Sequence, residues 1–278
     1  MDRNEKHFDE FRIALRGFTR NRLAVKCVYV LLALYAGALF AGFFAPYSFQ
    51  NEDRNYSYAP PTSIEIFDDR RLVRPYVFGR QLSFNEHNAR IYTIDPASEY
   101  PIRFFVPGDE YRLLGIFPCW YHLFGVEAPG RIYLIGADAR GRDVFSRLLY
   151  GAQISLSIGL IGVLISFAIG LIIGGISGYY GGRLDNFLMR LCEMVMMVPG
   201  FYLLLALRAA VPDTFNTVQV YFAIIIILSF IGWASLARII RGMCLSLRER
   251  EYVLAAKSLG LSDFRIILRH ILPHTLSY

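Results

Sequence analysis

Four stretches of this chain are apolar enough to be considered as membrane spans. A transmembrane helix needs about 20 consecutive, mainly apolar residues. The stretches that meet or approach this length are 27–44, 154–176, 189–211 and 218–237. The third is the weakest, because Arg190, Glu193 and Arg208 leave it only a short uncharged core. The pattern therefore predicts an all-α polytopic membrane protein with four spans.

Residues 1–26, ahead of the first span, alternate charged and apolar side chains. The apolar positions Phe8, Phe11, Leu15 and Phe18 predict a short amphipathic helix at the cytoplasmic surface. A long charged stretch precedes the first span, and no small-residue cleavage site follows it, so a cleaved signal peptide is not expected. We expect 27–44 to be a retained membrane anchor.

Basic residues gather before the first span and after the fourth. The first group is Arg3, Lys6, Arg12, Arg16, Arg20, Arg22 and Lys26, and the second is Arg238, Arg241, Arg248, Arg250, Lys257, Arg265 and Arg269. An even number of spans places both groups on one side of the membrane, which the positive-inside rule makes cytoplasmic. The net charge of +6 is therefore explained by topology and does not indicate nucleic-acid binding, while contact with anionic lipid remains compatible with it.

The segment 45–135 differs from the rest of the chain. It is dense in Tyr, Asn, Asp, Arg and Pro, and topology makes it extracytoplasmic. Loops longer than about 12–15 residues usually have a function or a structure of their own. Short aromatic and β-branched runs at 90–94, 102–106 and 131–135, separated by Pro and Gly, predict a small insert that contains strands. The insert either decorates the surface, with some docking role, or caps a translocation path.

Residues 251–273 read as two short helices that meet at Gly260. The first has an apolar face of Tyr252, Ala255, Ala256 and Leu259, and the second has one of Phe264, Ile267, Leu268 and Ile271. Gly260 can adopt the left-handed conformation that ends a helix, Ser262 is the expected N-cap, and Pro273 is expected to stop the second helix. Such a pair could lie on the lipid surface or dock to a soluble partner, and the pattern alone does not distinguish these.

Small residues recur every fourth position along the second span, at Gly162, Ser166, Gly170, Gly174 and Gly178. They lie on one helix face and permit close helix approach in lipid. Packing within the chain is the simpler interpretation, and a subunit or path-lining interface is the alternative. In the third span, Pro199 predicts a kink, and Arg190 and Glu193 are spaced to pair.

Composition and motifs argue against an enzyme. The 278 residues are 55% hydrophobic and 19% charged, with a mean hydropathy of +0.37, which is too apolar for an ordinary soluble enzyme. The sequence contains no phosphate-binding loop, dinucleotide fingerprint, HExxH or GxSxG motif. Its four cysteines are scattered and its five histidines lack metal-ligand spacing within one compartment. We therefore expect no catalytic residue, no metal and no cofactor bound by this chain.

Three stretches carry a resemblance to a known family. They are Leu254-Ala255-Ala256 with Gly260 and His270-Ile271-Leu272-Pro273, the block GADARGRDVFSRLLYGAQISLSIG at 136–159, and GYYGGRLD at 178–185. Together they resemble inner-membrane permeases of binding-protein-dependent ABC importers, in the dipeptide and oligopeptide branch. Leu254 stands where the family has glutamate and His270 where it has isoleucine, although RHILP is common in this branch. Ala137 replaces the usual threonine of the second block.

The resemblance implies a type I ABC-importer permease fold of about six spans, with a core over 136–278 and a cytoplasmic ATPase-coupling segment over 249–273. Its coupling positions are Arg250, Tyr252, Leu254, Ala255, Ala256, Lys257, Leu259, Gly260, His270, Leu272 and Pro273. Only four spans are present, so the sequence is expected to be a fragment or a truncated product.

The implied activity is import of peptides or peptide-like compounds across a bacterial inner membrane. The implied partners are a second permease, ABC ATPase subunits that bind ATP and Mg²⁺, and an extracytoplasmic substrate-binding protein. The alternative is a membrane assembly or sensor subunit whose insert binds a ligand, which would have no ATPase partner. A channel is the least favoured reading, because no filter-like sequence or ring of charge is present.

Overall fold

The structure is a computed structural model that describes residues 19–275, apart from 69–70 and 213. The chain divides into two compact units, one of residues 16–156 and one that includes residues 157–278. Their boundary falls within the long helix α4 (Val144–Tyr180). The apolar positions of the predicted N-terminal amphipathic helix, Phe8 to Phe18, lie outside the described residues.

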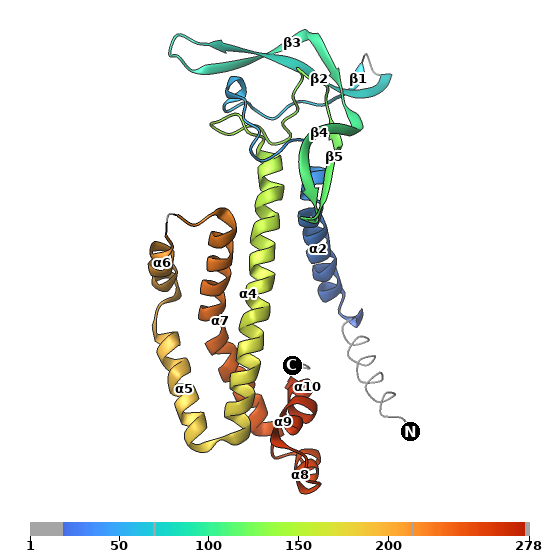
Figure 1. The fold of residues 1–278 in the computed structure, drawn as a ribbon. Coiled ribbons are helices and arrows are strands. Elements are labelled where there is room, and N and C mark those ends of the chain that lie inside the picture. Colours follow the sequence, from blue (N-terminus) through green and yellow to red (C-terminus); the bar gives the residue numbers. More distant parts are fainter. Residues whose placement is uncertain (1–18, 69–70, 213, 276–278) are drawn as a thin grey trace. The chain divides into compact units, whose positions relative to one another are not determined.

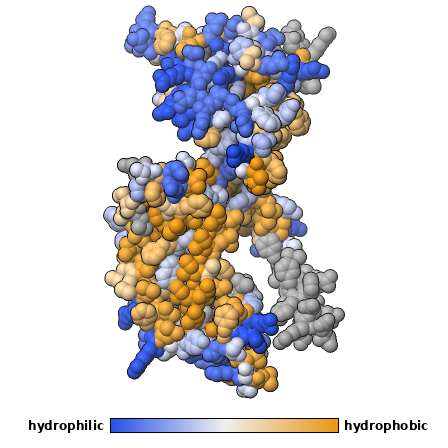
Figure 2. Space-filling model, in the orientation of Figure 1, coloured by the Kyte–Doolittle hydropathy of each residue, from blue (hydrophilic) through white to orange (hydrophobic). Residues whose placement is uncertain are grey.

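Within the described residues, three helices are long and apolar enough to cross a membrane. They are α2 (Arg22–Leu39), α4 and α7 (Thr217–Leu247). A fourth crossing results if α5 (Gly182–Met197) and α6 (Gly200–Ala210) are counted as one broken span. Figure 2 shows apolar side chains over these helices and hydrophilic ones over the strands. The predicted helical, multi-span fold is therefore confirmed, with three or four spans.

Two spans have different ends from those predicted. The Asn21 side chain accepts hydrogen bonds from the backbone N–H groups of Leu23 and Ala24. This N-cap starts α2 at Arg22 rather than 27, and a one-turn helix, α3 (Ala41–Phe44), follows it. Helix α7 continues to Leu247 instead of 237, so Arg238 and Arg241 lie on the helix and not after it.

The third predicted span is two helices rather than one. Helix α5 ends at Met197, Pro199 occupies the N-cap position of α6, and the two axes differ by 77°. Proline cannot donate a backbone hydrogen bond and disfavours helical geometry in the residue before it. The predicted kink is present and is large enough to separate the helices. The exposed Arg190 and Glu193 pair at 3.0 Å on α5.

Between α3 and α4 the chain forms strands. Strands β1 (Glu65–Asp68), β2 (Arg71–Phe84) and β3 (Arg90–Pro101) make an antiparallel sheet in the order β1-β2-β3. Strands β4 (Arg103–Leu113) and β5 (Phe117–Gly125) make a separate two-stranded antiparallel ribbon. A short 3₁₀ turn, η1 (Arg54–Tyr56), precedes them (Figure 1). The predicted strand content of this insert is confirmed.

One of the three runs expected to form strands does not. Residues 131–135 are irregular, although 90–94 begins β3 and most of 102–106 lies in β4. Ile132 and Tyr133 are fully buried, and Tyr133 packs with Ala59 and Ala137. The aromatic and branched residues of this run form a small core instead of pairing with a strand.

The small residues of α4 lie against α7 within the same chain. A Cβ atom at Gly170, Gly174 or Gly178 would lie 2.9, 2.5 or 2.5 Å from the nearest α7 atom. Ser166 Oγ donates to the Ser229 carbonyl at 3.0 Å, and Ser229 Oγ lies 3.3 Å from the Gly162 carbonyl oxygen. Backbone contact of this kind is how helices associate in lipid, where burial of apolar surface supplies little drive.

We expect alanine substitution to have opposite effects at two glycines of α4. Gly174→Ala places a methyl group 2.5 Å from the Ala237 carbonyl oxygen, so it should lower stability by about 1–3 kcal/mol. Gly159 has no atom within 4 Å of its Cβ position. Gly159→Ala should therefore raise stability by about 0.5–1 kcal/mol through helix propensity. Thermal unfolding of the purified protein in detergent measures both, and equal shifts would contradict close α4–α7 packing.

Candidate functional site

The C-terminal segment, residues 249–273, follows α7 and begins with α8 (Glu251–Ser258). Helix α8 ends at Ser258, and Gly260, two residues later, has φ +74°. The Leu261 N–H donates to the Ala256 carbonyl and the Gly260 N–H donates to the Lys257 carbonyl. These two bonds form a Schellman motif, which requires a left-handed residue that glycine adopts without strain. The two helices thus meet at Gly260, as the sequence predicts.

The second helix of the segment differs from prediction at both ends. It comprises α9 (Asp263–Ile266), a π-helical turn η2 (Ile267–Ile271) and α10 (Leu272–Thr275). Ser262 is at the N-cap position, but its side chain makes no capping hydrogen bond. Pro273 does not stop the helix. The Leu272 N–H bonds to the Ile267 carbonyl, five residues back, and this wider turn accommodates a ring that would clash in a regular α-helix.

The buried faces of the segment coincide only in part with the predicted apolar faces. Val253 and Ala256 are buried in α8, whereas Ala255 is exposed and Leu259 is 80% exposed. In the second helix, the buried residues include Ile266, Ile267, Ile271 and Leu272, while Phe264 and Leu268 are exposed. Of the predicted faces, Ala256, Ile267 and Ile271 are buried and the other positions are not. Helical spacing alone does not reveal which of two overlapping apolar stripes meets the neighbouring helix.

A hydrophobic cluster fixes the segment to the ends of α4 and α7. Its buried members are Ile240, Cys244, Val253, Ala256, Ile266, Ile267, Ile271 and Leu272, with Phe167, Leu171 and Tyr179 packed against it. Tyr179 Oη on α4 donates to Asp263 Oδ1 at 2.6 Å. A side chain at Gly175 would approach Leu272 to 3.2 Å. The C-terminal segment is therefore packed firmly against the ends of α4 and α7.

An ion pair joins Asp185 on α5 to Arg241 on α7. The Arg241 guanidinium donates from Nε to Asp185 Oδ1 at 2.6 Å and from Nη2 to Oδ2 at 2.5 Å. Ser177 Oγ on α4 donates to the same carboxylate at 2.5 Å. Asp185 is buried and lies in the first turn of α5, where the helix dipole favours negative charge. Sequence reasoning missed this cluster, since Arg241 is 56 residues from Asp185.

The α4–α5 turn makes the cluster possible. Gly181 and Gly182 have φ values of +65° and +61°, a backbone conformation that side chains disfavour. Arg248, just after α7, approaches the same turn, and its Nη1 donates to the Gly178 carbonyl at 3.3 Å. The Gly-rich turn within GYYGGRLD thus places α4, α5 and the end of α7 within hydrogen-bonding reach.

The outer surface of the C-terminal segment is partly apolar and partly basic. Leu254 is 52% exposed, and Tyr252, Lys257 and Phe264 of the same segment are exposed too. A hollow of about 370 Å³ opens beside it; its lining is Tyr179, Tyr180, Arg248, Glu249, Val253, Leu254, Lys257 and Asp263. Gly260 and Pro273 are exposed, and His270 is half-buried.

The loop before α4 contains the motif GADARGRD and belongs to the other unit. Asp138 Oδ1 accepts from the N–H groups of Arg140 and Arg142, and its Oδ2 pairs with Arg142 and Arg147. Burial alone would raise the pKa of Asp138, but these hydrogen bonds outweigh it and lower the pKa to about 2. Asp143 Oδ2 accepts from Ser146 N–H at 2.7 Å and caps α4. The motif therefore builds the start of the second span.

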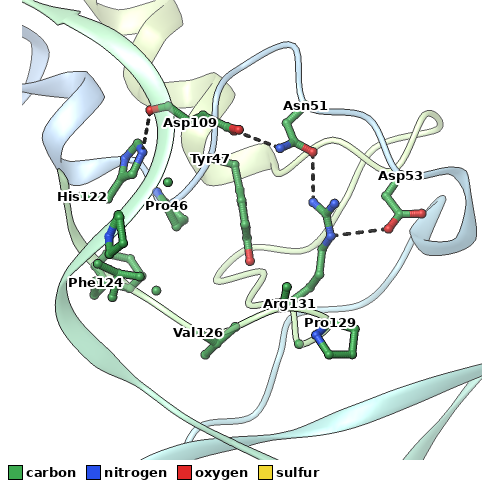
Figure 3. A pocket seen from close by; sticks show the side chains of 16 residues that line it. Pro46, Tyr47, Asn51, Asp53, Asp109, His122, Phe124, Val126, Pro129 and Arg131 are labelled. Atoms are coloured by element: carbon green, nitrogen blue, oxygen red, sulfur yellow. Dashed lines mark hydrogen bonds and ion pairs between the residues drawn. The ribbon is translucent and has the colours of Figure 1, made fainter. Parts of the chain in front are cut away.

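A hollow of about 420 Å³ lies within the insert (Figure 3). Asp109 Oδ2 accepts from Asn51 Nδ2 at 2.9 Å, and Asn51 Oδ1 accepts from Arg131 Nη1 at 3.0 Å. Arg131 also lies 3.4 Å from Asp53 and over the Tyr47 ring. Burial raises the pKa of Tyr47 to about 12. These polar side chains satisfy one another's hydrogen bonds. We therefore interpret them as structural contacts that hold the loops together. Within the described residues no group of three or more metal-ligating side chains is present.

Comparison with known proteins indicates the class. Residues 170–278 match the family model "Binding-protein-dependent transport system inner membrane component". Residues 10–61 match the "N-terminal TM domain of oligopeptide transport permease C". The two matches cover the first span, the last turns of α4, and everything from α5 to the end of the C-terminal segment. Over these two stretches the chain is similar to inner-membrane components of binding-protein-dependent transport systems, and to the oligopeptide permeases among them.

Particular relatives share about half of this chain. The dipeptide transport system permease protein DppC of Bacillus subtilis is 41% identical over 148 residues, 53% of this chain and 44% of the relative. The oligopeptide permease OppC of the same organism is 37% identical over 54% of this chain and 47% of its own. The glutathione transport system permease protein GsiD of Pectobacterium atrosepticum is 38% identical over 54% and 48%. The chain spans about half the length of the relatives it matches.

Removing one partner of the buried ion pair should be far more damaging than removing an exposed one. Asp185→Ala leaves Arg241 uncompensated and should cost about 3–5 kcal/mol. Glu193→Ala breaks the exposed pair with Arg190 and should cost less than about 1 kcal/mol.

Thermal unfolding in detergent compares these variants with the double variant Asp185→Ala/Arg241→Met. The double variant should recover part of the loss, since no unpaired charge remains. A double variant less stable than Asp185→Ala alone would contradict the assigned pairing.

Proposed function

We propose that this chain is a permease subunit of an ATP-driven importer of peptides or peptide-like compounds. The observation that carries the proposal is the C-terminal segment, which presents an exposed surface while its inner face is packed on the ends of α4 and α7. Similarity to the permease family supports the same role. The chain itself would perform no catalysis. ATP and Mg²⁺ would be bound by separate ATPase subunits.

In this proposal the segment transmits motion from the ATPases to the spans. Arg250, Tyr252, Leu254, Ala255, Lys257 and Leu259 would contact the ATPase. Ala256 and Leu272 are buried against Val253, Ile267 and the spans, so they are assigned to holding the segment and not to contact as the sequence had indicated. A segment fixed in this way would turn ATPase closure into rigid-body movement of α4 and α7.

Gly260, His270 and Pro273 have supporting parts in the proposal. Gly260 would set the angle between α8 and α9 through its left-handed conformation. Pro273 and His270 lie on the helical turns that follow, whose buried neighbours Ile271 and Leu272 belong to the cluster. The stripe of small residues on α4 would keep α4 and α7 together as they move.

The topology follows from the same role. The C-terminal segment and the N-terminus would lie in the cytoplasm, where ATP is available, and the insert over 45–135 would lie outside. A second permease would complete the path, and an extracytoplasmic binding protein would deliver the substrate.

Charge on the exposed face of the segment should uncouple the transporter without unfolding it. Leu259→Glu and Leu254→Glu change side chains that are 80% and 52% exposed. We expect each to reduce recovery of the ATPase subunits with the purified complex by about tenfold or more, because an apolar contact is lost and charge is added at the interface.

The matched control is Phe84→Glu, an equally exposed apolar position at the end of β2. It should leave ATPase recovery unchanged. Normal ATPase recovery and normal ATP-driven uptake in both leucine variants would refute the coupling role.

The substrate class is tested separately with the assembled transporter in proteoliposomes. A labelled tripeptide should accumulate only when ATP and the binding protein are present. Excess unlabelled peptide should compete, and the free amino acids should not. Competition by the amino acids alone would overturn the peptide assignment and leave the coupling role standing.

A further inference from the structure

The β4–β5 ribbon exposes more large apolar side chains than a water-facing hairpin should. Ile116 is 72% exposed, Phe117 59% and Trp120 51%. Others are Phe104, Phe105, Leu114 and Tyr121. The ribbon is a separate two-stranded sheet, so hydrogen bonding to a further strand does not cover its edges. Leu114, Ile116 and Phe117 lie together at the turn of the ribbon, and exposed apolar surface of this kind marks a site that meets a partner or a membrane.

The ribbon is attached to the end of the first span. Gly42 in α3 lies against the Tyr111 ring, which leaves no room for a Cβ atom at this position. His122 Nδ1 is 2.9 Å from the Gly42 carbonyl oxygen, and His122 is buried. The Phe43 and Phe105 rings lie 6.1 Å apart. Because α3 follows α2 directly, these contacts give the ribbon a defined position beside the span.

The turn of the ribbon points back along α2. In Figure 1 the turn between β4 and β5 lies at the level of the last turns of α2, and not beyond the end of that helix. The flank of α2 is itself apolar and exposed, with Leu31, Leu34 and Leu39 about half exposed. A helix that crosses the membrane presents such side chains to lipid. The apolar turn is therefore placed at the depth where α2 leaves the bilayer.

The residue types along the β4–β5 turn follow the order expected at a membrane boundary. Trp and Tyr are enriched at the membrane–water boundary of membrane proteins. Trp120 and Tyr121 lie on β5 farther from the turn, and the more apolar Ile116 and Phe117 lie nearer it. The exposed Arg112 can reach lipid phosphate while its stem covers apolar surface. We propose that residues 112–121 form a membrane-interface anchor, which inserts the β4–β5 turn into lipid beside α2.

Tryptophan fluorescence tests the anchor, because the chain has only two tryptophans. Trp233 is buried in α7, so Trp233→Phe leaves Trp120 as the reporter in the full chain, reconstituted into phosphatidylcholine nanodiscs. Lipid brominated near its headgroup should quench Trp120 more strongly than lipid brominated near the chain end, and aqueous iodide should quench it weakly. If Trp233→Phe does not fold, the spectrum of Trp120→Phe subtracted from that of the native protein gives the same signal.

Two other outcomes overturn the proposal. Strong iodide quenching without lipid quenching would place the turn in water. Protection from both quenchers would mean that a protein surface covers it. As matched variants, Ile116→Asp should reduce quenching by brominated lipid, and Phe84→Asp at the end of β2 should not. Unchanged quenching in Ile116→Asp would show that the turn does not carry Trp120 into lipid.

Discussion

The close approach of α4 and α7 is the contact on which the rest of the helical unit depends. Glycines at 170, 174 and 178 remove the side chains that would separate the two backbones. Only at that separation can Ser166 bond to the Ser229 carbonyl and Arg241 reach the Asp185–Ser177 pair. The hydrophobic cluster that holds the C-terminal segment is assembled from the same two helices. Small residues inside the spans thus determine the shape of a surface at their ends.

That surface combines rigidity with exposure. Its inner side chains are buried between helices, and the Tyr179–Asp263 hydrogen bond adds a polar link to α4. Its outer side chains, Leu254 and Leu259 among them, are free to meet another protein. A segment that was merely amphipathic would lie on lipid and transmit little. One that is packed against two spans can only move with them, which is the physical basis of the proposed coupling.

In the unit of residues 16–156, the strands and loops are held by contacts of a different kind. Its β4–β5 ribbon is fixed to the end of the first span through Gly42, Tyr111 and His122. Polar groups around Asn51, Asp109 and Arg131 connect the neighbouring loops and satisfy one another. An insert held at its base in this way can present a ribbon at a constant depth beside the membrane span, which a freely hinged loop could not do.

Hydropathy alone was sufficient to locate α2, α4 and α7, because a bilayer imposes length and polarity on each helix regardless of its neighbours. It did not reveal that the third apolar stretch is divided into α5 and α6. Glycine at 260 and proline at 199 were readable, since their backbone limits are local. Tertiary structure decided which stripe of α8 is buried, how the helix passes Pro273, and that Asp185 and Arg241 meet. It also turned residues 131–135 from an expected strand into core. Each of these depends on which surface faces a neighbouring element, and spacing along one chain segment does not contain that information.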